Sequence, residues 1–223
     1  MTEGSNLLAA LQHGDSFFPG GATAFSWGLE TLAGEGRVAG ADDVRDYVRT
    51  QLRGRWATFD RAAMIAAYRA AGDLEQVAAI DRMVEAQTLA RELREASRRM
   101  GGALLTVHRR IDTPGAAAYA ARDDAPGHCA VVQGLLWSGV GVSEAAADAM
   151  AAHQLCIGLL SAALRLSLIG HIEVQAILTG MRPSIATVLA TEPPDLDDMG
   201  AFMPEAEIAA MHHEIQDSRL FGN

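Results

Sequence analysis

Apolar side chains recur along this chain at spacings of three and four residues, and no stretch alternates for long between apolar and polar residues. Such spacing marks one face of a helix, whereas alternation would indicate a strand. The pattern is clearest from about Val84 to Ile111, where the apolar face consists of Leu89, Leu93, Ala96, Met100, Leu104, Val107 and Ile111. The opposite face carries Arg91, Glu92, Arg94, Glu95, Arg98 and Arg99. The segment is therefore predicted to be a long amphipathic helix.

Two glycines, Gly101 and Gly102, lie inside this predicted helix. Glycine costs about 1 kcal/mol relative to alanine in a helix interior. We therefore expect another helix to pack closely against this point.

Helical spacing also predicts helices around residues 7–11, 42–52, 60–71, 145–168 and 172–190, separated by glycine- and proline-rich breaks. The composition agrees, because alanine is the commonest residue and only 5% of the residues are aromatic. We expect an all-α, single-domain bundle of about eight to ten helices over residues 1–190.

The end of the chain differs from this body. Pro193 and Pro194 end the last long helix, and an acidic, irregular stretch continues to about Pro204. These residues separate the apolar end, Leu220 and Phe221, from the bundle that would otherwise bury it. We expect residues 191–223 to form an acidic linker and a flexible C-terminal tail that binds a partner.

Charge and composition exclude several classes of function. The chain has 223 residues with a formal net charge of −10, and all of its basic side chains are arginine. The acidic balance argues against nucleic-acid binding and against docking on anionic lipid. The lack of lysine excludes a Walker-type phosphate loop and Schiff-base chemistry.

The longest apolar stretch, Leu155–Ile172, is interrupted by polar side chains, and no secretory signal is visible. We expect a cytoplasmic protein that does not enter a membrane.

Candidate catalytic and metal-binding groups are few. Cys129 directly follows His128, so the two side chains would diverge on a helix, and a small buried residue is favoured over a nucleophile. His212 and His213 are also adjacent and diverge by about 100° on a helix. A metal site there would need Glu214 or a second subunit, and it is the less favoured alternative. We expect no catalytic residue, no cofactor and no metal site.

Two features favour binding to other proteins. One is the Phe17-Phe18-Pro19 loop, for which a core position and an interface position are left equally open. The other is the ending Arg219-Leu220-Phe221, because arginine beside large apolar residues is typical of interface anchors.

These segments carry a family resemblance. Residues 7–30, through Phe18-Pro19-Gly20-Gly21 and Ser26-Trp27-Gly28-Leu29-Glu30, resemble the N-terminal motif of the urease accessory protein UreF family. The ending from His213-Glu214 to Ser218-Arg219-Leu220-Phe221 is similar to the family's H-E-x-x-x-S-R-L-F. Further blocks at residues 98–105, 127–134 and 168–175 resemble family segments in the same order, although His171 stands where the family has glutamine.

The resemblance implies an all-α protein without enzymatic activity that forms a homodimer. It implies binding to UreD (also called UreH) and to the GTPase UreG, in an assembly that delivers nickel to apo-urease through UreD. Carried over by motif, the partner-binding candidates are Phe18, Gly20, Gly21, Ser26, Gly28, Glu30, His213, Glu214, Ser218, Arg219, Leu220 and Phe221.

Other functions remain open from the sequence. The protein could regulate GTP hydrolysis by its partner through an arginine supplied in trans. It could also carry nickel itself, or be a helical enzyme with a polar cleft.

Overall fold

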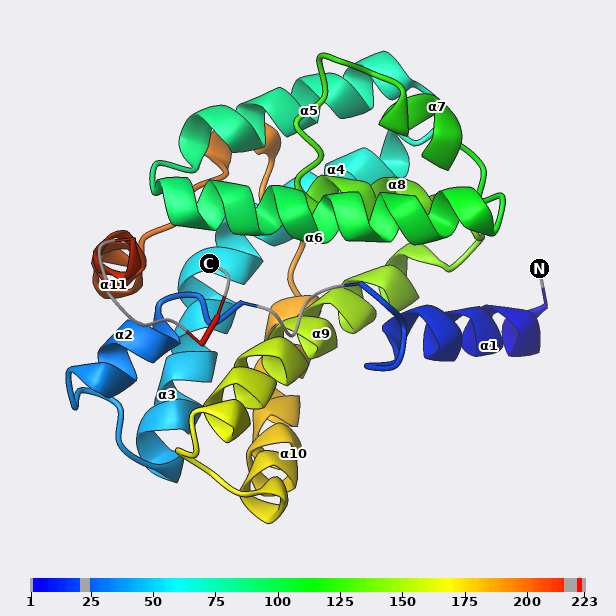
Figure 1. Ribbon diagram of the computed structural model, residues 1–223. Helices are drawn as coiled ribbons and strands as arrows, with labels where there is room; N and C mark the ends of the chain where they lie inside the picture. Colours follow the sequence, from blue (N-terminus) through cyan, green and yellow to red (C-terminus); the bar gives the residue numbers. More distant parts are fainter. Residues whose placement is uncertain (1, 21–24, 215–219, 222–223) are drawn as a thin grey trace.

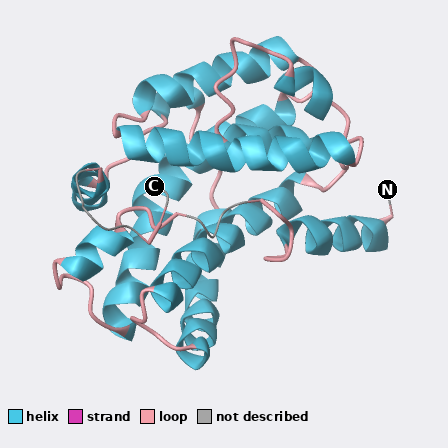
Figure 2. Ribbon diagram, viewed as in Figure 1, coloured by secondary structure: helices cyan, strands magenta, loops and turns pink. Residues whose placement is uncertain are grey.

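The structure is a computed structural model that describes residues 2–20, 25–214 and 220–221, and within them every regular element is helical (Figure 2). In chain order the elements are α1 (Glu3–Gly14), α2 (Leu29–Gly34), α3 (Ala41–Gln51), the π-helix η2 (Leu52–Asp60), α4 (Arg61–Arg69), α5 (Leu74–Gln87), α6 (Arg91–Arg110), α7 (Ala116–Ala120), α8 (Cys129–Gly139), α9 (Glu144–Arg165), α10 (His171–Leu189), the 3-10 turn η3 (Leu196–Asp198) and α11 (Pro204–His213). The predicted all-α class is confirmed.

One helical rod runs without interruption through α3, η2 and α4. Counted as one, it gives nine described α-helical rods over residues 1–190, within the expected eight to ten, and α11 adds a tenth. The sequence predicted a new helix starting at Asp60, but the backbone stays helical there in the wider π form. A π-helix winds more residues into each turn, so the faces of α3 and α4 are out of phase with a regular α-helix.

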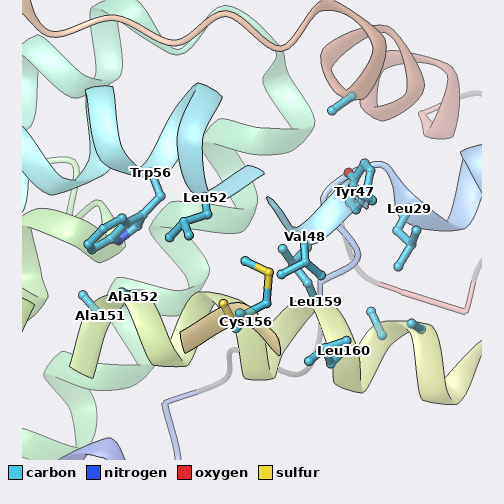
Figure 3. Packing of buried hydrophobic residues seen from close by; sticks show 14 of the residues in the cluster. Leu29, Tyr47, Val48, Leu52, Trp56, Ala151, Ala152, Cys156, Leu159 and Leu160 are labelled. Carbon is cyan, nitrogen blue, oxygen red and sulfur yellow. The ribbon is translucent and has the colours of Figure 1, made fainter. Parts of the chain in front are cut away.

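The helices form two packed halves that share this rod (Figure 1). In one half, α5, α6, α7 and α8 gather around α4, with Phe59, Tyr119 and Leu136 in its core. In the other half, α2, α3, α9 and α10 pack together. Figure 3 shows this second core, in which Val48 and Leu52 face Leu159 and Cys156 of α9. Trp27 contacts both cores and so lies at their junction.

The predicted helix over residues 84–111 is two helices, because the chain breaks at 88–90. The Oγ1 hydroxyl of Thr88 donates to the carbonyl of Val84 at 2.8 Å. The guanidinium of Arg94 donates to the carbonyls of Thr88 and Leu89 at 2.7 and 2.8 Å. Side chains thus satisfy carbonyl groups at the break, which helical spacing alone does not reveal.

The expected close approach is found at Gly101, whose neighbours are the loop residue Gly127 and the first residue of α8, Cys129, whereas a Cβ on Gly102 would meet nothing within 4 Å. A Cβ on Gly101 would overlap the carbonyl oxygen of Gly127 in the segment before α8. The buried carboxylate of Asp81 fixes this segment by accepting from the backbone N–H groups of Gly127 and His128, at 2.5 and 2.9 Å, and from the hydroxyl of Tyr119.

α9 is the central helix of the second half. By length and composition alone it could cross a membrane, but 61% of its most apolar window is buried inside the fold. Burial among the surrounding helices accounts for its apolar character.

The acidic segment after α10 crosses back over the body. The buried Arg61 pairs with Asp148 and donates to the carbonyls of Val188 and Thr191, at 3.1 and 2.8 Å. The N–H groups of Gly200 and Phe202 donate to carbonyl oxygens of η2, both at 3.0 Å. The described part of the expected linker is therefore fixed to the body by backbone hydrogen bonds. The expected flexibility of the tail concerns residues 215–219 and 222–223, which lie outside the described residues.

Candidate functional site

Glu30 lies in the first turn of α2, where its carboxylate meets the C-terminal end of the chain. The Nε2–H of His213 donates to Glu30 Oε2 at 3.0 Å. The backbone N–H of Leu220 donates to Oε1 at 2.6 Å, and that of Phe221 to Oε2 at 3.2 Å. One side chain from the N-terminal motif thus binds three groups of the C-terminal motif. We call this set, together with Glu92 and Arg165, the Glu30 site.

His213 is fully buried between two carboxylates. Its Nδ1 lies 3.9 Å from Oε2 of Glu92 on α6, on the side opposite Glu30. His212, its neighbour, points outward and lies 3.5 Å from Glu35. The adjacent histidines diverge as expected. Within the described residues, no group of three or more histidine, cysteine, aspartate or glutamate side chains could hold a metal ion.

Phe221 anchors the end of the described chain. Its side chain is 5% exposed and belongs to the core of the second half. The guanidinium of Arg165, at the end of α9, lies 4.2 Å from the centre of the Phe221 ring and also donates to the carbonyl of Leu220 at 3.3 Å. The expectation that the linker keeps this apolar end away from the bundle is wrong for Phe221, because the linker folds back and allows the ring to reach the core.

Gly28 determines how closely α11 approaches α2. Its φ of 89° lies in the left-handed region, and a Cβ there would be 2.7 Å from the carbonyl oxygen of Ala206. Glycine is the residue that tolerates both conditions. Gly28 therefore positions α11, and with it His213, over Glu30.

The edge of the Glu30 site is solvated and charged. Glu214 pairs with Arg91 at the start of α6, and both side chains are more than a third exposed. Leu220 is 51% exposed beside the buried Phe221. A buried anchor surrounded by exposed polar and apolar groups has the composition of a protein-binding surface.

The remaining candidates lie elsewhere or outside the described residues. Ser26 is fully buried, and its carbonyl accepts from the N–H of Leu29 at 3.0 Å.

Phe18 and Gly20 belong to a separate junction between α1 and α6, where a Cβ on Gly20 would lie 3.1 Å from Leu104. Gly21, Ser218 and Arg219 are among the residues that the structure does not describe. Phe17 is 93% exposed, so the loop has one aromatic side chain in solvent and one packed on the body.

Sequence reasoning missed Glu92 and Arg165 as members of the Glu30 site. Glu92 was assigned to a solvated face, yet it is 6% exposed. Its position, one turn before Ala96 on the apolar face, could have indicated this. Arg165 is a charge near the end of a long apolar helix, and such charges commonly have a specific partner.

The two cysteines are unreactive in this fold. Burial raises the pKa of the Cys129 thiol and of the Cys156 thiol to about 12. Both therefore stay protonated at neutral pH, and the thiol is a poor nucleophile in that form.

Comparison with known proteins gives the family. The family model for UreF matches residues 38–182. A urease accessory protein UreF from Trichodesmium erythraeum is 35% identical over 230 residues, covering 98% of this chain and 97% of that protein. This chain belongs to the UreF family. UreF proteins from Brucella ovis and Kocuria rhizophila are 31% and 30% identical and cover 92% and 97% of the chain. The alignments with these UreF relatives extend beyond the matched model and cover nearly the whole chain.

Proposed function

We propose that this protein is a non-enzymatic scaffold of urease maturation, which binds UreD (UreH) and the GTPase UreG and so helps deliver nickel to apo-urease. The observation that carries the proposal is the meeting of the N-terminal and C-terminal family motifs at the Glu30 site. Two segments about 190 residues apart in sequence combine into one surface there. Such a composite surface suits recognition by another protein, since it forms only in the folded chain.

The arrangement favours UreD as the partner of the C-terminal end. Leu220 presents an apolar side chain next to the charged pair Arg91 and Glu214. The motif candidates Ser218 and Arg219 are part of the same proposal and lie outside the described residues. UreG would bind another face, and the scaffold would couple its nucleotide state to nickel release through differential affinity.

The proposal includes a homodimer, and α10 offers the surface that would support it. Although α10 is mainly apolar, only Ile177 and Met181 are buried among its residues. Ile172 is 83% exposed, and Val174, Leu178 and Ile185 are half-buried. An apolar helix face left open in one copy is commonly covered in an oligomer.

A cytoplasmic location is also part of the proposal, and two observations support it. Cys129 and Cys156 are both free thiols, which fits a reducing compartment. The relatives are named as urease accessory proteins, which supports a place beside that enzyme. Nickel is cargo here and not a resident cofactor.

Regulation of GTP hydrolysis is the alternative that the structure favours less. The arginines at the start of α6, Arg91, Arg94, Arg98 and Arg99, each lie within 4 Å of a carboxylate. An arginine that acts on a bound GTPase would first have to break its ion pair with that carboxylate. Single-turnover hydrolysis by UreG with and without this chain tests that alternative, and equilibrium dialysis with nickel tests a carrier role.

Co-purification tests the proposed scaffold. Tagged wild-type protein is expected to retain UreD, and UreG in its presence, with and without guanine nucleotide. Glu30→Gln keeps the shape of the side chain but removes the charge that holds His213, Leu220 and Phe221 in place, so we expect UreD retention to fall at least about tenfold. Glu75→Gln, in a solvated ion pair on α5, is the matched control and should bind normally. Failure of the wild-type chain to retain UreD would overturn the proposed function, whereas normal binding by Glu30→Gln would remove only the Glu30 site from it.

A further inference from the structure

The N-terminal helix is attached to the body in an unusual way. His13 is the only buried residue of α1. The exposed residues of α1 include three large apolar ones, Leu7, Leu8 and Leu11. Ala9 and Ala10 lie partly buried against the core, and Asn6 donates to the carbonyl of Gly141 at 3.1 Å. The largest side chain that fixes α1 is therefore an imidazole.

That imidazole stacks on a second one. The ring centroids of His13 and His108 are 5.0 Å apart, and the planes differ by 25°. Phe18, from the loop after α1, lies over both rings, with centroids 5.0 and 5.3 Å away. The three rings join α1, the loop and α6 at one point.

Neither imidazole is fully satisfied by hydrogen bonds. The Nδ1 of His108 lies 2.8 Å from the hydroxyl of Thr113. The Nε2 of His108 and the Nδ1 of His13 are buried without a hydrogen-bond partner among the described residues. A neutral ring already carries one proton, and a second one would place a positive charge in a buried site where the unpartnered nitrogen has nothing to accept its hydrogen bond, which is costly.

The charged groups nearby are directed elsewhere. The carboxylate of Asp15 accepts from the N–H of Phe17 at 2.8 Å. Arg109 and Arg110, which follow His108, are exposed, as is His153 on α9. From α9 the group that meets α1 here is the amide of Gln154, which donates to the carbonyl of His13 at 2.9 Å. No described carboxylate therefore stabilises a charged form of the pair.

We propose that His13 and His108 form an acid-sensitive lock, which holds α1 and the Phe17-Phe18 loop on the body at neutral pH and releases them as the pH falls. When α1 is released, the two rings reach water and each can be protonated. The exposed Leu7, Leu8, Leu11 and Phe17 leave with α1, so the orientation of this apolar surface changes with pH. The proposal does not depend on the partners named above.

The directions of the histidine pKa shifts agree with release of α1 at low pH. Burial lowers the pKa of His13, and burial together with the charge of His13 lowers the pKa of His108 to about 4. The docked state thus binds fewer protons than the released state, in which histidine titrates near pH 6.5. Docking is strongest above that pH and weakens below it. His108 alone would weaken docking about 30-fold between pH 7.5 and pH 5.0.

Hydrogen exchange of the full chain tests the lock. After correction for the pH dependence of chemical exchange, protection of the α1 amides should fall by about 30-fold from pH 7.5 to pH 5.0, while α6 and α9 stay protected. His108→Asn keeps an amide that can meet Thr113 but has no titratable ring, so it should abolish most of this loss. His171→Gln, at an exposed histidine at the start of α10, is the control and should behave like the wild type.

Three results would overturn the proposal: protection of α1 that does not change with pH, a full pH response in His108→Asn, or loss of protection in α1, α6 and α9 together. If His108→Asn is unstable, His108→Phe gives a second reading, because it keeps an aromatic ring in the stack without a titratable nitrogen. A full pH response in that variant would contradict the lock in the same way.

Discussion

At the C-terminal end of the described chain, one carboxylate accepts hydrogen bonds from three groups, whereas at the N-terminal end two imidazoles face each other with a ring nitrogen of each unpartnered. The Glu30 site depends on a charge that is present. The stack of His13, Phe18 and His108 depends on a charge that is absent. The contact at one end therefore needs an ionised carboxylate, and the contact at the other end needs neutral imidazoles. A change of pH need not weaken the two contacts equally.

The largest effect should come from removing the charged acceptor. Glu30→Ala leaves the buried His213 and the N–H groups of Leu220 and Phe221 without their acceptor, at about 1–3 kcal/mol for each unsatisfied group. We expect amide exchange at Leu220 and Phe221 to rise by at least about 100-fold, since each 1.4 kcal/mol is a factor of ten. Exchange in α1 should not change. A similar rise in α1 would show that the two ends are coupled and would contradict the comparison.

Shortening the aromatic side chain at the other junction should have an intermediate effect. Phe18→Ala removes a half-buried ring that lies over both His13 and His108. We expect a loss of about 1–2 kcal/mol in the docking of α1, less than for a fully buried phenylalanine. Heteronuclear NMR of amide signals in α1 measures this, with Phe17→Ala as the exposed control. An equal response of both variants would argue against the stack as the attachment point.

The smallest effect should come from the exposed ion pair at the edge of the Glu30 site. Arg91→Gln breaks the pair with Glu214, and such solvated pairs contribute about 0.2–1 kcal/mol. Denaturant unfolding should shift only slightly, and the shift should vanish in high salt. A loss above about 2 kcal/mol would mean that the pair is effectively buried.

Much of the fold could be predicted from the sequence, because helical spacing is a local property. The long helices α9 and α10 fall within three residues of their predicted limits. The break between α5 and α6 could not be found in this way, because side chains from the following helix satisfy its carbonyls. The π-helix was likewise hidden, since its residues have no distinctive spacing of their own.

The candidate site was predictable only in part. Family motifs drew attention to Glu30, His213 and Phe221, but no spacing rule places residues 30 and 221 in contact. Glu92 and Arg165 were recognised only in the tertiary structure, although the position of each in its helix carried a signal in the sequence. Phe18 illustrates another limit: the sequence left core and interface equally open for this loop, and the structure packs Phe18 against the body and leaves Phe17 exposed.

The continuous rod through η2 limits where residues can be inserted into this chain or deleted from it. The α3 arm contributes to one core and the α4 arm to both, so the rotation between the arms is set by the number of residues in the nine-residue π segment. Adding or removing a single residue there would turn one arm by about 100° relative to the other, and Val48 or Ala63 would then face water. Surface loops of this protein can be lengthened freely by comparison, whereas residues 52–60 act as a fixed spacer.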